Sequence, residues 1–464
     1  MCLITKTILM GKKKRTIDKP NVNVDEAKLN EYVERLQKML RCRTVSDEAN
    51  VNEEEFTAFR EVLREEFPLL HEKGELLTFD GALVFRVKGK EDRNIILMSH
   101  HDVVHEHGDW QYPAFGAEIH DGALYNRGTL DTKTPLFAEL QAVEELLAEG
   151  FEFPVNVYIA SSNNEEVCGL GIVKAVNYFK ENNIHFEWVL DEGGAIMEQQ
   201  VPGVKERTAM IAVHEKSRHT FTCIAKKNDF KGHGGFSSKV DNPAQRMANF
   251  IKEASEMKLK RKLYPEVRAM FEHCAPNMTF PMRFLFSNLG VFGGLLVKLL
   301  PKISDQTTAM LGTSVLFTEI KSEGGSDQVR PEVIKANMFV RCVRDTDLAD
   351  EMATMQEIAK KYDIEIKGEL VDYCKPADFN SNSFKFIESV LNKNFPNVVV
   401  APFLLTAGTD ARRLTDVADN IYRFAPITIS KEQFKTIHSP NENILLTSIG
   451  EAVCFYKELV RTFK

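Results

Sequence analysis

Apolar residues in the first part of the chain form short runs separated by stretches with helical spacing. The runs NIILM (94–98), VNVYIA (155–160) and FEWVL (186–190) are short, rich in strand-forming residues and bounded by polar clusters. The stretch 134–150, TPLFAELQAVEELLAEG, has apolar residues at helical spacing and ends in glycine. Strands that alternate with helices in this way predict an α/β domain built on a mostly parallel sheet.

The pattern changes near residue 208 and changes back near residue 371. Between these points we expect antiparallel strands and helices, at AMIAVH (209–214), HTFTCIA (219–225), the stretch that follows Pro243, and ANMFVRCV (336–343). The last part of the chain resumes the first pattern, with a strand over 397–405 and a helix over 448–463. We therefore predict an α+β module, residues 208–370, inserted into an α/β domain made of residues 1–207 and 371–464.

Composition restricts the class of protein. The 464 residues are 43% hydrophobic and 27% charged, which is typical of a globular protein with more than one core. A net charge of −8 gives no support for a nucleic-acid or anionic-membrane surface. The apolar stretch 284–297 is too short and too interrupted to span a bilayer, so we expect a buried or interfacial helix there. Eight cysteines without a CxxC pair argue against disulfides and a thiolate zinc site, and favour the cytoplasm.

Acids and histidines follow the ends of three predicted strands. Ligands of open α/β sheets bind beyond the carboxyl ends of the strands, so these positions are candidate site residues. A fourth acid lies on a glycine-containing loop before the helix 134–150, and a histidine lies near the end of the chain. The complete set is His100, His101 and Asp102, then Glu165 and Glu166, then Asp191 and Glu192, with Asp131 and His438.

The alternation of an extended chain separates the two adjacent histidines. Residues two apart share a face, so His100 and Asp102 point together and His101 points away. A histidine that binds a metal usually donates its other ring N–H to a carboxylate. We therefore expect His100 to be a metal ligand and Asp102 to orient it.

The number of converging groups favours two metal ions over one, because a single zinc needs only three protein ligands and water. Two such ions require a bridging anion, for which Asp131 is the candidate. The histidines favour Zn²⁺, with Co²⁺ or Mn²⁺ as alternatives, over ions that prefer all-oxygen sites. One of the adjacent glutamates Glu165 and Glu166 then binds metal, and the other is free to move protons.

In these residues the chain resembles the dinuclear zinc peptidases that include aminoacylase, glutamate carboxypeptidase and succinyl-diaminopimelate desuccinylase. It is most similar to the carboxypeptidase S and N-acyl-amino-acid hydrolase branch. The resemblance runs from about Glu31 to the end and rests on ordered motifs: ILMSHHDVV, YNRGTLDTK, NNEEVCGLG, VLDEGG, AGTDARRL and IHSPNENI.

The resemblance implies a role for each residue. It places His100, Asp131 and Asp191 on one zinc, and Asp131, Glu166 and His438 on the other. It implies that Glu165 is the general base and acid, that Asp102 supports His100, and that a cis peptide follows Asp131. It also implies that the inserted module is a lid that often forms a homodimer.

Three motifs depart from the family pattern. Phe236 stands where a lid histidine is usual, and His233 is the candidate to replace it. Gln328 stands where asparagine is expected, and YNRG replaces YGRG. These departures concern stabilisation of the transition state and choice of substrate, whereas the metal ligands are intact.

The implied reaction is hydrolysis of an amide bond next to a free carboxylate, by a hydroxide that bridges the two metal ions. Arg341 and Arg412 are candidates to bind the carboxylate, and Gly408 and Thr409 are candidate main-chain donors. Three functions stay open: a carboxypeptidase or dipeptidase on short peptides, an N-acyl-amino-acid amidohydrolase, and an inactive zinc-binding dimer.

Overall fold

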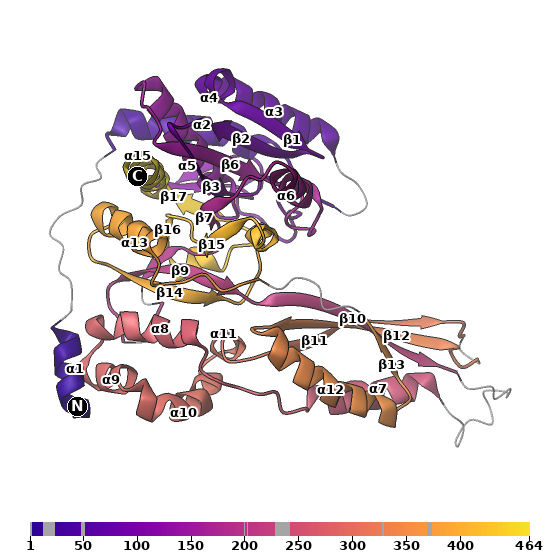
Figure 1. Cartoon of the computed structure of the whole chain (residues 1–464). Helices are drawn as coiled ribbons and strands as arrows, with labels where there is room; N and C mark the ends of the chain where they lie inside the picture. The colour runs from indigo at the N-terminus through magenta and orange to yellow at the C-terminus, as the bar shows by residue number, and fades with distance from the viewer. Residues whose placement is uncertain are drawn as a thin grey trace.

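A ten-stranded, mostly parallel sheet forms the centre of the protein in the computed structural model (Figure 1). The structure describes residues 2–12, 24–47, 52–198, 200–201, 203–227, 242–326, 329–368 and 374–464. In sheet order the strands are β1 (Glu75–Phe79), β2 (Ala82–Val87), β6 (Val155–Ser161), β3 (Glu91–Met98), β7 (Phe186–Asp191), β15 (Ala418–Arg423), β9 (Arg207–Glu215), β8 (Ile196–Glu198) and β16 (Thr428–Ile429), and β14 (Val398–Leu405) pairs with β9.

Helices cover both faces of this sheet, which explains why its central strands are apolar throughout. Leu97 points into one core and Ile96 into the other, as expected for alternate residues of a strand. The first core packs against α2 (Glu26–Arg41), α3 (Glu53–Glu66), α4 (Pro68–Lys73), α5 (Lys133–Ala148), α13 (Asn382–Asn394) and α15 (Leu446–Thr462). The second core packs against α6 (Gly171–Glu181) and the short helix η4 (Asp410–Leu414).

A separate antiparallel sheet forms the second domain. Its order is β11 (Ser314–Glu323), β12 (Val333–Cys342), β10 (Ser217–Lys226) and β13 (Glu365–Lys367). Two helices, α7 (Pro243–Ser255) and α12 (Asp345–Lys361), cover one face and share its core. The predicted fold class, an α/β domain with an inserted α+β domain, is therefore confirmed.

The two sheets divide the chain differently from the sequence pattern. β9, which we expected to belong to the antiparallel module, pairs in parallel with β14 inside the large sheet. Only Lys216 separates β9 from β10, the first strand of the second sheet. We therefore propose that the insertion begins near Lys216 and not at residue 208.

Part of the inserted segment packs on the large sheet. The helices α8 (Pro265–Cys274), α9 (Phe280–Ser287), α10 (Leu289–Leu299) and α11 (Asp305–Ala309) lie beneath β9 and β14, next to α1 (Leu3–Gly11) (Figure 1). Residues of α8, α9 and α10 share a core with both strands. The inserted segment therefore contributes two bodies, the antiparallel domain and a helical layer against the large sheet.

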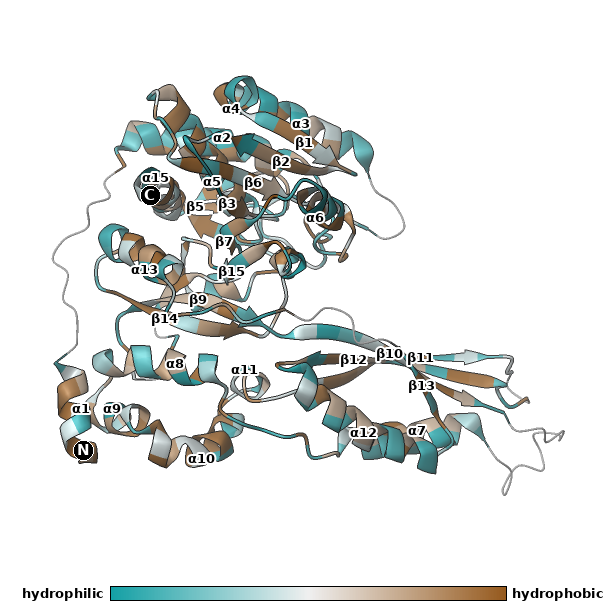
Figure 2. Ribbon diagram, viewed as in Figure 1, coloured by the Kyte–Doolittle hydropathy of each residue, from teal (hydrophilic) through white to brown (hydrophobic). Residues whose placement is uncertain are grey.

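The apolar stretch 284–297 folds as two helices with a break at Asn288. The Asn288 side chain donates hydrogen bonds to Phe284 O (2.7 Å) and Thr7 Oγ1 (3.2 Å) at this break. Figure 2 shows many hydrophobic residues along α1, α9 and α10. Among the described residues no single helix has the length and hydropathy of a membrane span, although α9 and the helical segment 289–302 satisfy that test jointly, with a bend of 105° between them.

A three-stranded sheet of β4 (Glu118–His120), β5 (Ala123–Tyr125) and β17 (Asn443–Leu445) joins distant parts of the chain. β5 leads into the loop of Asp131, and β17 follows the segment that carries His438. The remaining short helices are η2 (Ala275–Asn277), η3 (Leu300–Lys302) and α14 (Lys431–Phe434).

Candidate metal centre

Three neighbouring parallel strands deliver side chains to one edge of the large sheet. β6, β3 and β7 lie side by side, and their carboxyl ends are followed by Glu166, His100 and Glu192. The loop after β5 adds Asp131, and the segment before β17 adds His438. This is the edge at which the sequence predicted the site.

Asp131 connects two groups of possible metal ligands. In one group Asp131 lies with His100 and Glu192, and in the other it lies with Glu166 and His438. Within each group the ligand atoms lie within 4.8 Å of one another. His100 Nε2 is 3.0 Å from Asp131 Oδ1, and His438 Nε2 is 3.0 Å from Asp131 Oδ2. Each oxygen of this carboxylate therefore faces a different histidine, as a bridging ligand requires.

Glu192, and not Asp191, forms the ligand group with His100 and Asp131, although both acids line a small space beside His100. The carboxylate of Asp191 accepts hydrogen bonds from Glu192 N (2.9 Å) and Ala411 N (3.0 Å). Successive side chains at the end of a strand point to opposite sides, so a shift of one residue exchanges the two acids. Asp191 instead holds the end of β7 to η4.

Asp102 lies beneath His100, as the alternation of the chain predicted. The Nδ1 atom of His100 is 3.0 Å from Asp102 O and 3.3 Å from Asp102 Oδ1. The carboxylate also accepts hydrogen bonds from Ser46 Oγ (2.6 Å) and from the backbone N–H groups of Glu165 and Glu166 (3.1 Å each). Asp102 thus fixes the ring of His100 and the start of the glutamate loop together.

His101 points into the core. Its ring stacks on Phe59 with centroids 5.0 Å apart, and its Nδ1 lies 2.8 Å from Ser161 Oγ. Burial lowers the pKa of His101 to about 3, so the ring is neutral at physiological pH. Of the two adjacent histidines, only His100 faces Asp131.

Glu442 supports the loop of Asp131, and the sequence analysis did not identify it. This buried carboxylate accepts hydrogen bonds from the backbone N–H groups of Leu130 (2.7 Å) and Asp131 (3.2 Å). It also pairs with Arg127 Nη1 at 2.7 Å. Glu442 lies in the motif HSPNEN, four residues after His438, so one short segment supplies a ligand and a support for the facing loop. The peptide bond between Asp131 and Thr132 is cis.

The acids around Asp131 carry more negative charge than the neighbouring protein groups neutralise. Burial raises the pKa of Glu165, Glu166 and Glu192, and the neighbouring carboxylates raise it further. Hydrogen bonds to Asp131 and Glu166 raise the pKa of His438 to about 10. A raised pKa is expected for carboxyl groups and for a histidine where several carboxylates lie close together, because the negative charge attracts protons and other cations. Two imidazoles with carboxylates suit a divalent metal of borderline softness, so the donor set fits such ions.

Glu165 belongs to neither ligand group but lines the same pocket. The pocket has a volume of about 430 Å³ and is also lined by Asp131, Glu166, Glu192 and His438. This volume lies within the usual range of about 300–1,000 Å³ for small-molecule sites. A partly buried carboxylate that is close to the ligands but outside the set can accept and release protons.

Arginines and main-chain groups converge at one side of this pocket. Gly408 and Thr409 line the pocket, and a Cβ atom at Gly408 would lie 2.8 Å from Arg412 Nη1 and 3.3 Å from Arg341 Nη1. Arg412 Nη1 donates to Thr409 O (3.2 Å) and lies 3.7 Å from Glu215 Oε1. Arg341 Nη1 is buried and has no hydrogen-bond partner among the described residues. The two candidate arginines therefore differ, since Arg412 already has partners and Arg341 Nη1 has none within the described part of the chain.

The predicted lid donor His233, with Phe236 and Gln328, lies outside the described residues.

The chain is similar to known proteins over most of its length. The model of peptidase family M20/M25/M40 matches residues 96–462. The chain is 29% identical to probable carboxypeptidase S-like 2 of Dictyostelium discoideum, over 93% of this chain and 85% of that protein. It is 31% identical to the N-fatty-acyl-amino acid synthase/hydrolase PM20D1.1 of Danio rerio, over 79% and 72% of the two chains.

A solved structure shows the same fold. The M20 family metallo-carboxypeptidase Sso-CP2 of Sulfolobus solfataricus superposes with a TM-score of 0.69 and 18% identity, over 94% of this chain and 99% of that one. Because the family model covers most of the chain and includes every residue of the metal centre, the chain belongs to peptidase family M20/M25/M40 and is a hydrolase.

Proposed function

We propose that the protein hydrolyses an amide bond next to a free carboxylate, in a short peptide or an N-acyl amino acid. The observation that carries this proposal is the carboxylate of Asp131, which lies between two groups of ligand atoms. We assign His100, Asp131 and Glu192 to one divalent ion, and Asp131, Glu166 and His438 to the other. Two imidazoles in the set favour Zn²⁺, with Co²⁺ or Mn²⁺ as substitutes.

When bound, the two ions supply Lewis acidity for a carbonyl oxygen and make water more acidic. The residues of the chain supply the proton transfers. Glu165 accepts a proton from the attacking water and donates it to the amide nitrogen as the C–N bond breaks. Its free carboxylate in the pocket also argues against an inactive zinc-binding dimer, because a binding module would not need a proton carrier beside its ligands.

Arg341 is the proposed partner of the substrate carboxylate. Burial lowers the pKa of its guanidinium, and the nearby Arg412 and Arg218 lower it further. An arriving carboxylate would relieve this repulsion and give Arg341 Nη1 a hydrogen-bond acceptor. Arg412, Gly408 and Thr409 shape the same corner, in which Glu215 Oε2 accepts a hydrogen bond from Thr409 N (3.2 Å).

The relatives support both substrate classes. One is named as a probable carboxypeptidase, which supports a peptide substrate, and the other as a hydrolase of N-fatty-acyl amino acids. We propose the peptide reaction as the first candidate and the N-acyl reaction as the second. All eight cysteines are free, which supports the proposed cytoplasmic location.

We also propose a homodimer formed through the antiparallel domain. β11 is an edge strand of that sheet, and Leu316 and Ile320 on it are 60% and 62% exposed. An edge strand with exposed apolar residues is a ready partner for another chain.

The assignment of Glu192 predicts different metal contents for two neighbouring variants. Glu192→Gln removes a ligand and should reduce the bound metal from about two ions to about one. Asp191→Asn should keep both ions with weaker affinity, since a group that only supports the site typically costs about 10- to 100-fold. Elemental analysis after equilibration with zinc measures the content. The reverse result would restore Asp191 as the ligand.

Glu165→Gln should lower kcat by about 10²- to 10⁴-fold, because the charge-neutral amide cannot carry protons. Bound zinc should stay unchanged, since Glu165 lies outside both ligand groups. Turnover of N-acetyl amino acids and of dipeptides with apolar ends provides the measurement. Glu181→Gln, on the exposed end of α6, is the matched control. Turnover that survives in Glu165→Gln would refute the proposed role.

Arg341→Ala should raise KM about 10- to 100-fold for substrates with a free carboxylate, as expected for loss of a charged hydrogen bond. The same variant should change KM little for the matching C-terminal amides, which lack the negative charge. Steady-state kinetics on each pair of substrates gives the comparison. An equal loss on acids and amides would show that Arg341 acts through the structure alone.

The double variant Leu316→Glu/Ile320→Glu should convert the proposed dimer into a monomer, because four charges would meet at the interface. Sedimentation velocity measures the mass, and Leu76→Glu on β1, an edge strand of the large sheet, is the control. A wild-type protein that is monomeric at high concentration would exclude the dimer.

A further inference from the structure

A third group of possible metal ligands lies in the antiparallel domain, outside the metal centre. It consists of His219 on β10, Cys342 at the end of β12 and Asp345 at the start of α12. One ligand atom of each lies within 4.8 Å of the other two. His219 and Cys342 are buried, and Asp345 is partly buried. The metal centre and the proposed reaction use none of these three residues.

The register of the sheet brings these side chains together. β10 and β12 are antiparallel, with Ser217 opposite Cys342. His219 lies two residues after Ser217, so it shares that face of the sheet and is diagonal to Cys342. α12 begins at Asp345 and covers the same face. The backbone of two strands and one helix therefore sets the positions of all three ligands.

The distances between the ligand atoms suit a tetrahedral ion. His219 Nε2 is 3.7 Å from Cys342 Sγ, and Asp345 Oδ1 is 3.9 Å from the same sulfur. Around a tetrahedral zinc, a sulfur ligand lies about 3.6 Å from a nitrogen or oxygen ligand. An ion therefore fits between the three atoms with only small movements of the side chains.

Ser217 orients two of the ligands. Its Oγ lies 2.9 Å from Cys342 Sγ and 3.2 Å from His219 Nε2. Burial raises the pKa of the Cys342 thiol to about 11, so the sulfur keeps its proton when no metal is bound. A divalent metal would displace that proton, and its charge would balance the thiolate and the carboxylate of Asp345.

We propose that His219, Cys342 and Asp345 bind a zinc ion, with water or Ser217 Oγ as the fourth ligand. A thiolate, an imidazole and a carboxylate together suit Zn²⁺ better than Mg²⁺ or Ca²⁺, which prefer oxygen ligands. A site with one thiolate needs no CxxC pair, so the spacing of the cysteines does not indicate it. Binding of this ion is independent of the proposed amide hydrolysis.

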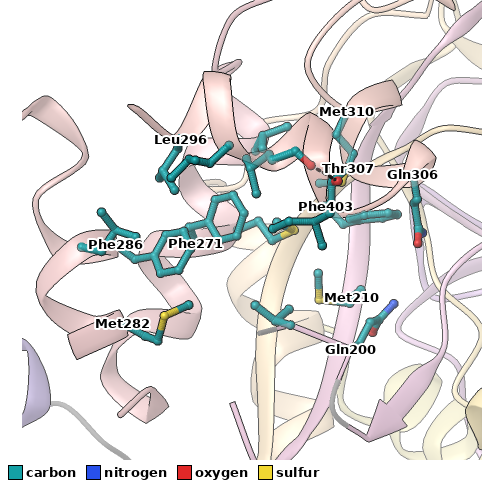
Figure 3. A pocket seen from close by; sticks show the side chains of 17 residues that line it. Gln200, Met210, Phe271, Met282, Phe286, Leu296, Gln306, Thr307, Met310 and Phe403 are labelled. Carbon is teal, nitrogen blue, oxygen red and sulfur yellow. Dashed lines mark hydrogen bonds between the residues drawn. The ribbon is translucent and has the colours of Figure 1, made fainter. Parts of the chain in front are cut away.

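The ion would strengthen the junction between the antiparallel domain and the helical layer. Lys216 donates hydrogen bonds to Ala309 O (3.0 Å) and Gly312 O (2.8 Å), at and after the end of α11. Gln306 of the same helix lines an apolar cavity of about 260 Å³ between the helical layer and the large sheet (Figure 3). The proposed site adjoins Lys216 in sequence and therefore ties β10 to β12 and α12 at the point where the domain meets these helices.

The same strand carries Arg341, the proposed partner of the substrate carboxylate. Arg341 directly precedes Cys342 on β12, and successive side chains of a strand point to opposite faces. A metal that holds Cys342 on one face therefore fixes the segment from which Arg341 approaches Gly408 on the other.

Cobalt-substituted protein tests the site by its absorption spectrum. The residues assigned to the metal centre include no cysteine, so a charge-transfer band from thiolate to Co²⁺ reports a cysteine ligand elsewhere. Wild-type protein should show this band and bind about three ions, two of them at the metal centre. The contents expected for Glu192→Gln and Asp191→Asn count the metal centre alone, and the new site adds about one ion to each. Absence of the band would overturn the inference.

Cys342→Ala should abolish the band and lower the metal content by about one ion, with both ions of the metal centre retained. Cys223→Ala is the matched control and should keep the band. Cys223 is buried in the same core, and it belongs to none of the ligand groups found among the described residues. A band that survives in Cys342→Ala would show that another cysteine binds the cobalt, and would refute the site.

Asp345→Asn keeps the thiol and removes the carboxylate, at a position that is only partly buried. It should lose most of the band at the same Co²⁺ concentration. Asp350→Asn, at an exposed position further along α12, should keep it. Far-ultraviolet circular dichroism checks that each variant is folded. Equal bands in Asp345→Asn and the wild type would overturn the three-ligand site.

Discussion

The arrangement of the site depends on one shared carboxylate. Each oxygen of Asp131 lies 3.0 Å from a different histidine, one after β3 and one near the end of the chain. Three further acids, Glu165, Glu166 and Glu192, line the same pocket, and burial of unpaired carboxylates is costly. Two divalent cations would offset this cost and give each buried acid an oppositely charged neighbour. The strands, loops and supporting residues of the site are best understood as the frame that holds Asp131 between the two ions.

That frame is built from residues that never touch a metal. Asp102 links His100 to the backbone of Glu165 and Glu166, and Glu442 holds the loop of Asp131 from the opposite side. Both carboxylates are buried and accept several hydrogen bonds, so each fixes two segments that are distant in the sequence. The cluster is therefore preorganised, and its geometry depends on contacts between strand ends and on the small β4–β5–β17 sheet.

The sequence predicts well the features of the site that follow from the spacing of residues along one strand. It predicts poorly the features that depend on where a side chain points or on which distant segment it contacts. The edge at which the acids collect, the approach of His100 to Asp131 and the turn of His101 away from that carboxylate follow from strand periodicity. The choice between Asp191 and Glu192 does not, since it depends on the direction in which the last residue of β7 points and on the hydrogen bonds that Asp191 accepts from Glu192 N and Ala411 N. Glu442 resembles any polar residue in a loop, and only the fold shows that it faces residues 128–131. For the same reason β9 resembles an antiparallel strand, although its partner β14 lies almost 200 residues later.

The apolar stretch 284–297 shows how one sequence feature changes its meaning in the fold. Its length and composition suggest a buried helix, but the break at Asn288 bends it into two helices with a hollow between them and the large sheet. The hollow adjoins the metal centre through Met210 and Phe403, residues of two paired strands of the large sheet. Because these strands belong to the scaffold that also carries the ligands, the catalytic groups and the apolar wall are held at a fixed separation.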